Sequence, residues 1–463
     1  MIYARDLAKQ QLSYGNNVSM LMPGKYKEGA SKSQISYFSK IDGLPVYQII
    51  NGIPFSTCGI SNPKLFTNSI TNNNYEKFLK EGKFDIVHIH SLIGFPKEII
   101  EITNKLKIKT CFTSHDYFAL CPKIYLINYK NEQCIDNNNG LDCVKCNMNI
   151  NECLEIERRN KFFNLSYQLY NKASKILVKY RIYENVKRVI RKIGIKSLYI
   201  KNRLPDNIFT DQRNDEENDH TIYKYLREYH INILNKIDLF IFNSSVAFKE
   251  YEKYIDLSKR KYFIIPVTHN RIRNNYNDKP CDCSLKEIVH FGYMGYLNRI
   301  KGFYDLVETL NEILSNYTNW DIKIYGDYSG IDISTFDKNH FIFEGLYDHN
   351  RLTEIFAKID MLIIPSKWKE TFGFIGLEAL SYCVPILASN NVGITDLIEN
   401  EVTGIIYKDN FKNQELYTSI VNILNNPYKV NRYKVSLLKT SFSYGLEEHS
   451  KRLIELYLSL KCD

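Results

Sequence analysis

The sequence predicts an α/β protein made of two Rossmann-like domains, each built on a doubly wound parallel sheet. The chain has 463 residues, 44% of them hydrophobic, which is enough for two or three domains with buried cores. Short apolar segments alternate with longer amphipathic segments along most of that length. Such strand–helix alternation indicates parallel sheets that are covered by helices on both faces.

The expected strands fall into two series, and helices such as 304–314 and 352–359 lie between them. In chain order we expect strands at 18–22, 46–50, 85–89, 109–112, 239–243 and 263–266, and then at 288–291, 321–325, 341–343, 361–364, 385–388 and 404–407. A polar segment that begins at Asn270 separates the two series and indicates a linker. We therefore expect a first domain over 1–272, a second over 273–440, and a C-terminal helix within 441–463 that returns to the first domain.

Residues 151–236 interrupt the first series with a helical pattern, and nine Lys or Arg residues lie between Lys179 and Arg203. Apolar residues are interleaved with them, so this insert either rests on anionic lipid headgroups or presents a solvated basic face. It matches no nucleic-acid recognition module, and no nucleic-acid partner is expected. The net charge of +9 suits an anionic substrate or an anionic membrane surface equally well.

Targeting signals are absent from the sequence pattern. No apolar run approaches the roughly 18 residues that a membrane-spanning helix needs. The first residues are amphipathic and include Asp6, which is not the pattern of a signal peptide. We expect a cytoplasmic protein, with peripheral contact at the inner face of the cell membrane as a further option. In that compartment the eleven cysteines would be reduced.

Two carboxylates, Glu370 and Glu378, flank a glycine-containing turn between an apolar strand and a helix. Backbone N–H groups at a helix start bind anions, and carboxylates accept hydrogen bonds from hydroxyls. The segment therefore suits a ligand with phosphate at one end and sugar at the other. A second strand–loop–helix, which contains Gly295 and Lys301, can also hold a diphosphate. Its glycine spacing fits neither the dinucleotide fingerprint nor a P-loop.

With its flanking strands, the Pro-Ser-x-x-x-Glu-x-Phe-Gly segment at 365–373 resembles the family 4 retaining glycosyltransferases of the GT-B fold. The resemblance implies that Glu370 holds hydroxyls of the donor sugar and that Glu378 binds the nucleotide ribose. It also implies that Lys301 neutralises the leaving diphosphate. The other donor-binding residues that it implies are Gly295, Phe372, Gly373, Phe374 and Ile375.

The family usually has an arginine five residues before the lysine. That position is Tyr296 here, and Arg299 is the candidate substitute. In the first domain, His90 and His115 each follow a strand, where ligands of open parallel sheets bind. By resemblance, His115 faces the reacting carbon of the donor and has an orienting and stabilising role. No carboxylate of this domain stands out as a nucleophile, which suits the front-face retaining mechanism proposed for the family.

The sequence contains no Asp-x-Asp motif that would hold a divalent metal on a diphosphate. We therefore expect catalysis without a metal or other cofactor, with Lys301 and helix N–H groups in place of Mg²⁺. A cysteine-rich loop over 121–153 follows His115. Its thiols either form a structural zinc site or remain reduced and partly buried; the four candidate ligands are Cys121, Cys134, Cys143 and Cys146.

The resemblance implies an enzyme that moves a sugar from a UDP- or GDP-sugar to a glycan or lipid-linked acceptor in surface polysaccharide or glycolipid synthesis. The family's first strand and glycine-rich loop have no counterpart before Tyr3, and losing a central strand would expose sheet edges. The alternatives are an inactive nucleotide-sugar-binding pseudoenzyme, a truncated product, or another GT-B enzyme such as a sugar-nucleotide epimerase. A phosphorylase should carry a cofactor-binding lysine context, which the sequence does not show.

Overall fold

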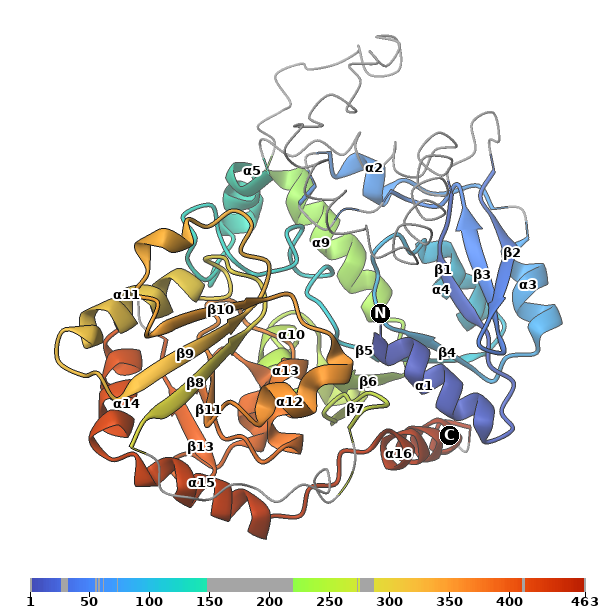
Figure 1. The fold of residues 1–463 in the computed structure, drawn as a ribbon. Helices are drawn as coiled ribbons and strands as arrows, with labels where there is room; N and C mark the ends of the chain where they lie inside the picture. Colours follow the sequence, from blue (N-terminus) through green and yellow to red (C-terminus); the bar gives the residue numbers. More distant parts are fainter. Residues whose placement is uncertain are drawn as a thin grey trace, which may run out of the picture.

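The computed structural model describes residues 2–25, 32–54, 56, 59–60, 62–72, 74–147, 220–272, 274, 287–409 and 413–461. It confirms the predicted α/β class. Two halves lie side by side, each with helices packed around a parallel sheet (Figure 1).

The C-terminal half holds one six-stranded sheet in the order β10-β9-β8-β11-β12-β13, and every neighbouring pair is parallel. The chain starts in the middle at β8, moves outward to one edge, and then returns to fill the other side. This is the doubly wound order that the strand–helix alternation predicts. The strands are β8 (Val289–Met294), β9 (Trp320–Tyr325), β10 (Phe341–Gly345), β11 (Met361–Ile364), β12 (Ile386–Ser389) and β13 (Gly404–Tyr407).

Helices cover both faces of this sheet, because its central strands are apolar on both sides. β11 and β12 are buried along their whole length. Leu306 and Leu310 of one helix belong to the core on one face, and Leu377 and Leu380 of another belong to the core on the opposite face. The helices of this half are α11 (Phe303–Leu314), α12 (Leu352–Phe356), α13 (Phe374–Ser381), α14 (Gln414–Asn425) and α15 (Tyr428–Lys439).

The N-terminal half contains two separate sheets. The larger is parallel, in the order β4 (Ile86–Ile89), β5 (Lys109–Thr113), β6 (Leu239–Phe242) and β7 (Lys261–Ile264). The smaller has the order β1 (Met20–Pro23), β3 (Leu44–Ile50) and β2 (Gln34–Ile41), so β1 and β4 are edge strands of different sheets. The helices of this half are α1 (Ile2–Ser13), α2 (Lys64–Thr67), α3 (Tyr75–Gly82), α4 (Lys97–Lys105), α5 (Leu141–Asn147), α9 (Thr221–Leu234) and α10 (Ser245–Tyr251).

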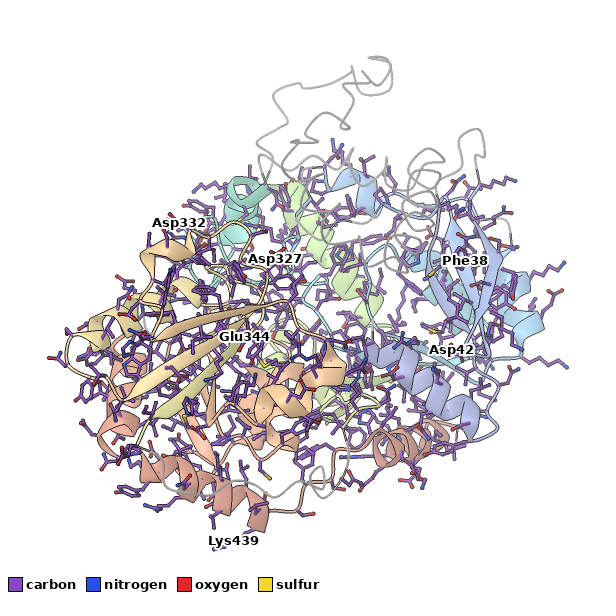
Figure 2. The ribbon with its side chains drawn as sticks, viewed as in Figure 1. Phe38, Asp42, Asp327, Asp332, Glu344 and Lys439 are labelled. Carbon is purple, nitrogen blue, oxygen red and sulfur yellow. The ribbon has the colours of Figure 1, made fainter. Side chains whose placement is uncertain are left out.

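The expectation of parallel strands only is wrong for β2, which was not predicted and pairs with β3 antiparallel. Asp42 and Gly43 form the connection, with φ angles of 50° and 87°. Asp-Gly with both residues at positive φ is the preferred two-residue hairpin turn, because its twist matches that of the strands. Asp42, labelled in Figure 2, also accepts a hydrogen bond from Lys9 of α1 at 3.0 Å.

The last helix, α16 (Leu446–Ser459), lies against α1 of the N-terminal half (Figure 1). Tyr14 donates a hydrogen bond to the carbonyl of Glu447 at 3.2 Å, and the Tyr457 hydroxyl lies 2.6 Å from Nδ1 of His88 in β4. The C-terminus therefore packs on the half that holds the N-terminus.

Most of the predicted basic insert at 151–236 lies outside the described residues, and so does the end of the cysteine-rich loop after residue 147. The end of the insert is described, and it forms α9. No helix in the described ranges is long and apolar enough to span a bilayer.

Candidate functional site

The candidate site lies where the strand order of the C-terminal sheet reverses. β8 and β11 are neighbours, and the chain leaves them toward opposite edges of the sheet. Loops beyond the carboxyl ends of two such strands diverge and create a place for a ligand. Lys301 lies in the loop after β8, and Glu370 lies in the loop after β11. The topology therefore brings together two residues that are distant in sequence.

Lys301 and Glu370 form an ion pair, with Nζ 2.7 Å from Oε1. The Glu370 side chain is buried, whereas the lysine is partly exposed. The Lys301 ammonium also lies 5.3 Å from the ring centroid of Trp368, which adds a cation–π contact. Because the carboxylate is largely removed from water, this cation acts on it more strongly than it would at an open surface.

Gly302 allows the two loops to touch. Its φ is +70°, and a Cβ at this position would lie 1.7 Å from the carbonyl oxygen of Pro365. Only glycine has both the backbone freedom and the space for this contact. The close approach of the loop after β8 to the loop after β11 fixes how far apart Lys301 and Glu370 can lie.

Backbone hydrogen bonds hold the Glu370 segment. The N–H of Glu370 donates to the carbonyl of Asn391 at 2.9 Å, and the N–H of Gly393 donates to the carbonyl of Glu370 at 3.0 Å. Gly373, with a φ of +97°, then caps the N-terminus of α13. Phe374 and Ile375 form the first turn of α13, where N–H groups have no partner within the helix. The backbone hydrogen bonds of Glu370 therefore hold the segment that leads into the predicted anion-binding turn.

Glu378 is buried in α13 and faces two histidines that the sequence did not indicate. Oε1 lies 3.1 Å from Nε2 of His269 and 3.1 Å from Nδ1 of His349. Burial raises the pKa of Glu378, but the two imidazoles outweigh it and hold the pKa below its usual value. The hydrogen bond to Glu378 in turn raises the pKa of His349. The carboxylate is therefore kept ionised.

His115 belongs to a partly buried aromatic cluster at the carboxyl ends of β4 and β5. Its Nε2 lies 3.1 Å from Nδ1 of His90, and the Tyr3 ring centroid lies 4.9 Å from the His115 ring. Burial lowers the pKa of His90 to about 4 and that of His115 well below its usual value. Both imidazoles are neutral near pH 7, so they can orient a ligand by hydrogen bonding but carry no charge to it.

Two hydrogen bonds connect the N-terminal half to the loop after β11. Thr371 Oγ1 donates to the carbonyl of His115 at 3.1 Å, and Ser244 Oγ donates to the carbonyl of Thr371 at 2.8 Å. Ser244 also caps the N-terminus of α10. The residue that follows Glu370 thus touches the backbone of His115, and the two predicted regions face each other.

Other predicted donor-binding residues are not drawn into these contacts. Arg299 is exposed, and its guanidinium lies 5.8 Å from the Tyr304 ring instead of joining the Lys301 pair. Gly295 has a φ of +144° and open space where a Cβ would be.

Sequence reasoning also missed site residues. Trp368 and Thr371 lie inside the recognised segment and could have been named from it. His269 and His349 come from separate loops, and no local pattern marks them.

The four predicted zinc ligands come together around one small cavity of the N-terminal half. All four are free thiols. In the described part of the chain, no group of three or more His, Cys, Asp or Glu side chains is already arranged to hold a metal ion.

Comparison with known proteins identifies a domain family and a fold. Residues 286–436 match the family described as Glycosyl transferases group 1. The sequence is 25% identical over 194 residues to an uncharacterized 41.2 kDa protein in the cps region of Klebsiella pneumoniae, a match that covers 40% of this chain and 51% of the relative. It is 24% identical over 186 residues to spore coat protein SA of Bacillus subtilis, over 37% of this chain and 48% of the relative.

A solved structure with a similar fold is the sucrose-phosphate synthase of Thermosynechococcus elongatus. It has a TM-score of 0.52 at 14% sequence identity, and the match covers 100% of this chain and 93% of that one. The fold is therefore GT-B, as predicted, with a glycosyl transferases group 1 domain in its C-terminal half. The sequence matches span about half the length of the two relatives.

Proposed function

Because residues 286–436 carry a glycosyl transferases group 1 domain, we propose that this chain is a retaining, family 4 glycosyltransferase. It would transfer a hexose or related sugar from a nucleotide-sugar donor to a glycan or lipid-linked acceptor. The observation that carries the proposal is the pair of carboxylates at the switch point of the sheet. Glu370 lies against Lys301 there, and Glu378 is held ionised by two histidines.

Glu378 would bind the ribose of the donor nucleotide, UDP or GDP. Both histidines contact its Oε1, and Oε2 has no hydrogen-bond partner among the described residues. Oε2 can therefore accept hydrogen bonds from the vicinal hydroxyls of a ribose. A hydrogen bond to a charged acceptor contributes about 1.5–3 kcal/mol.

Lys301 and the first N–H groups of α13 would stabilise the leaving group. As the bond from the sugar C1 to the diphosphate oxygen breaks, negative charge grows on the diphosphate. Positive groups already aimed at that charge contribute a few kcal/mol each. Gly295 and Arg299 belong to the loop after β8 that also holds Lys301, where open space at Gly295 permits close backbone approach.

Glu370 would accept hydrogen bonds from hydroxyls of the sugar, and His115 would orient the sugar from the opposite half. The acceptor hydroxyl forms the new bond to C1 on the face that the diphosphate leaves, and its proton passes to the departing diphosphate oxygen. This sequence of steps retains the configuration at C1 and requires no metal ion or other cofactor.

The acceptor side of the proposal rests on the family resemblance and on the basic sequence between Lys179 and Arg203. We propose that the acceptor is a lipid-linked or surface glycan, met at the inner face of the cell membrane. Attraction between the basic segment and anionic headgroups would supply the peripheral contact.

The test is calorimetric titration of UDP and of GDP into the chain and into Glu378→Gln. Glu354→Gln is the matched control, because Glu354 is an exposed glutamate of the same half whose carboxylate pairs with Arg351. We expect one nucleotide to bind saturably, about tenfold or more weaker in Glu378→Gln and unchanged in the control. Absence of binding by the folded protein would overturn the proposal.

Turnover is tested next with the matching nucleotide-sugar, by following nucleotide release and the anomeric configuration of the product by NMR. Nucleotide release together with a product of retained anomeric configuration would support the proposed retaining transferase. Binding without any turnover, across a panel of donors and acceptors, would instead identify a nucleotide-sugar-binding pseudoenzyme.

A further inference from the structure

Four thiols converge at one place in the N-terminal half, and the proposed transfer chemistry uses none of them. Arg227 of α9 and Tyr254 border the same cavity. The thiols come from the described segment between the end of β5 and residue 147, and two of them lie on α5. They are Cys121, Cys134, Cys143 and Cys146.

Backbone contacts explain why residues distant in sequence meet here. The N–H of Cys121 donates to the carbonyl of Tyr117 at 2.8 Å, which ends a tight turn after β5. The N–H of Cys134 donates to the carbonyl of Leu126 at 2.8 Å, so the chain turns back on itself. Cys143 and Cys146 are three residues apart on α5 and therefore share one face of that helix.

Two cationic side chains lie beside the thiols. The Arg227 guanidinium donates from Nη2 to the Cys143 sulfur at 3.4 Å. Lys123 borders the same cavity. Groups of this kind surround metal-bound thiolates and offset their charge.

We propose that the four cysteines bind one zinc ion that has a structural role. On binding, each thiol releases its proton to solvent, and Zn²⁺ with four thiolates leaves a net charge of −2 that Arg227 and Lys123 offset. The sulfur atoms must rotate inward to reach the ion, since they do not yet surround a common point. Four thiolates complete a tetrahedral shell and leave no position for substrate. The inference does not depend on the proposed transferase activity.

The zinc ion would hold the loop against the C-terminal half. Gln133, next to Cys134, donates from Nε2 to Oδ1 of Asn391 at 2.6 Å and to the carbonyl of Lys367 at 3.2 Å. The Tyr125 ring lies 5.1 Å from the Trp368 ring in an edge-on contact. The loop thus contacts the segment that leads to Glu370, and fixing its cysteines would fix that contact.

The experiment measures the zinc content of the full chain, purified in a reducing buffer without chelator, by elemental analysis. We expect about one zinc per chain, as a four-cysteine site requires. Cys134→Ser and Cys146→Ser should lose it. Cys383→Gly is the matched control, because Cys383 is a buried thiol at the end of α13, far from the loop in sequence, with a φ of 58° that glycine adopts readily.

Cobalt(II) substitution of the wild-type chain keeps the test valid if a serine variant misfolds. Cobalt(II) bound by four thiolates in a tetrahedron gives intense visible absorption bands. The bound metal ion should also protect the cysteines from a thiol reagent until a chelator is added. Wild-type protein that takes up neither metal in reducing buffer would overturn the proposal. So would zinc retained at the wild-type level by both serine variants, or disulfides among the four cysteines in protein purified under reducing conditions.

Discussion

Replacing Gly302 with alanine should separate the two loops that carry Lys301 and Glu370. The new Cβ would lie 1.7 Å from the carbonyl oxygen of Pro365, and real Cβ atoms essentially never come closer than 3.0 Å. The two backbones must therefore move apart by at least 3.0 − 1.7 = 1.3 Å. The left-handed φ of +70° adds about 1–2 kcal/mol of strain for any residue with a Cβ.

The shift acts on the neighbouring ion pair. If the contact between Lys301 Nζ and Glu370 Oε1 took up the whole displacement, it would lengthen from 2.7 Å to about 4.0 Å, since 2.7 + 1.3 = 4.0. A misplacement of about 1 Å at a reacting centre costs on the order of 10²-fold in rate. We expect Gly302→Ala to lose turnover by about that factor and to unfold more readily by about 1–3 kcal/mol.

The assay is steady-state transfer from the nucleotide-sugar that binds, together with chemical unfolding followed by circular dichroism. Gly330→Ala is the control, because Gly330 lies in a turn with nothing within 4 Å of the added Cβ and no left-handed φ. Turnover and unfolding of Gly302→Ala within twofold of wild type would refute the reasoning. An equal loss in Gly330→Ala would show that the effect is not specific to the loop contact.

Three further outcomes are expected. Lys301→Met should lower turnover by about 10²-fold, because the variant loses the cation beside the leaving group and leaves the buried Glu370 carboxylate without that cation. A rate within a few fold of wild type in the transfer assay would contradict this role. The hydrogen bond to Glu378 raises the pKa of His349. The pair therefore stabilises the fold fully when the pH is below the ordinary pKa of histidine, and this stabilisation is lost as the pH rises through the raised pKa of His349. The Tm difference between wild type and His349→Gln should therefore be largest below about pH 6 and small above about pH 8, and a pH-independent difference would count against the pair. Lys434→Met should destabilise by about 3–5 kcal/mol in urea unfolding, since it removes the cation beside the Asp360 carboxylate, which lies 3.0 Å from Lys434 Nζ with both side chains only 6% exposed. The double variant Asp360→Asn/Lys434→Met should recover much of that loss, and no recovery would contradict the charge argument.

The sequence by itself determined the α/β class and the strands of both predicted series, because their signals are local. A run such as 361–364 is apolar on both faces, which is typical of a buried parallel strand. It also determined Glu370 and Glu378 as candidate residues, since a strand, a glycine turn and a helix start are adjacent in the chain. β2 was missed although its signal is also local: Asp42-Gly43 lies between two alternating segments.

Only the tertiary structure decided which residues meet. Lys301 lies beside Glu370 because β8 and β11 are neighbours, and strand order depends on the packing of the whole sheet rather than on any one segment. His269 and His349 reach Glu378 from two separate loops, and each looks like an ordinary surface or strand-end histidine in the sequence. Periodicity along the chain indicates which face of an element is buried, but not which other element covers that face. The chemistry of this site depends on which elements pack together.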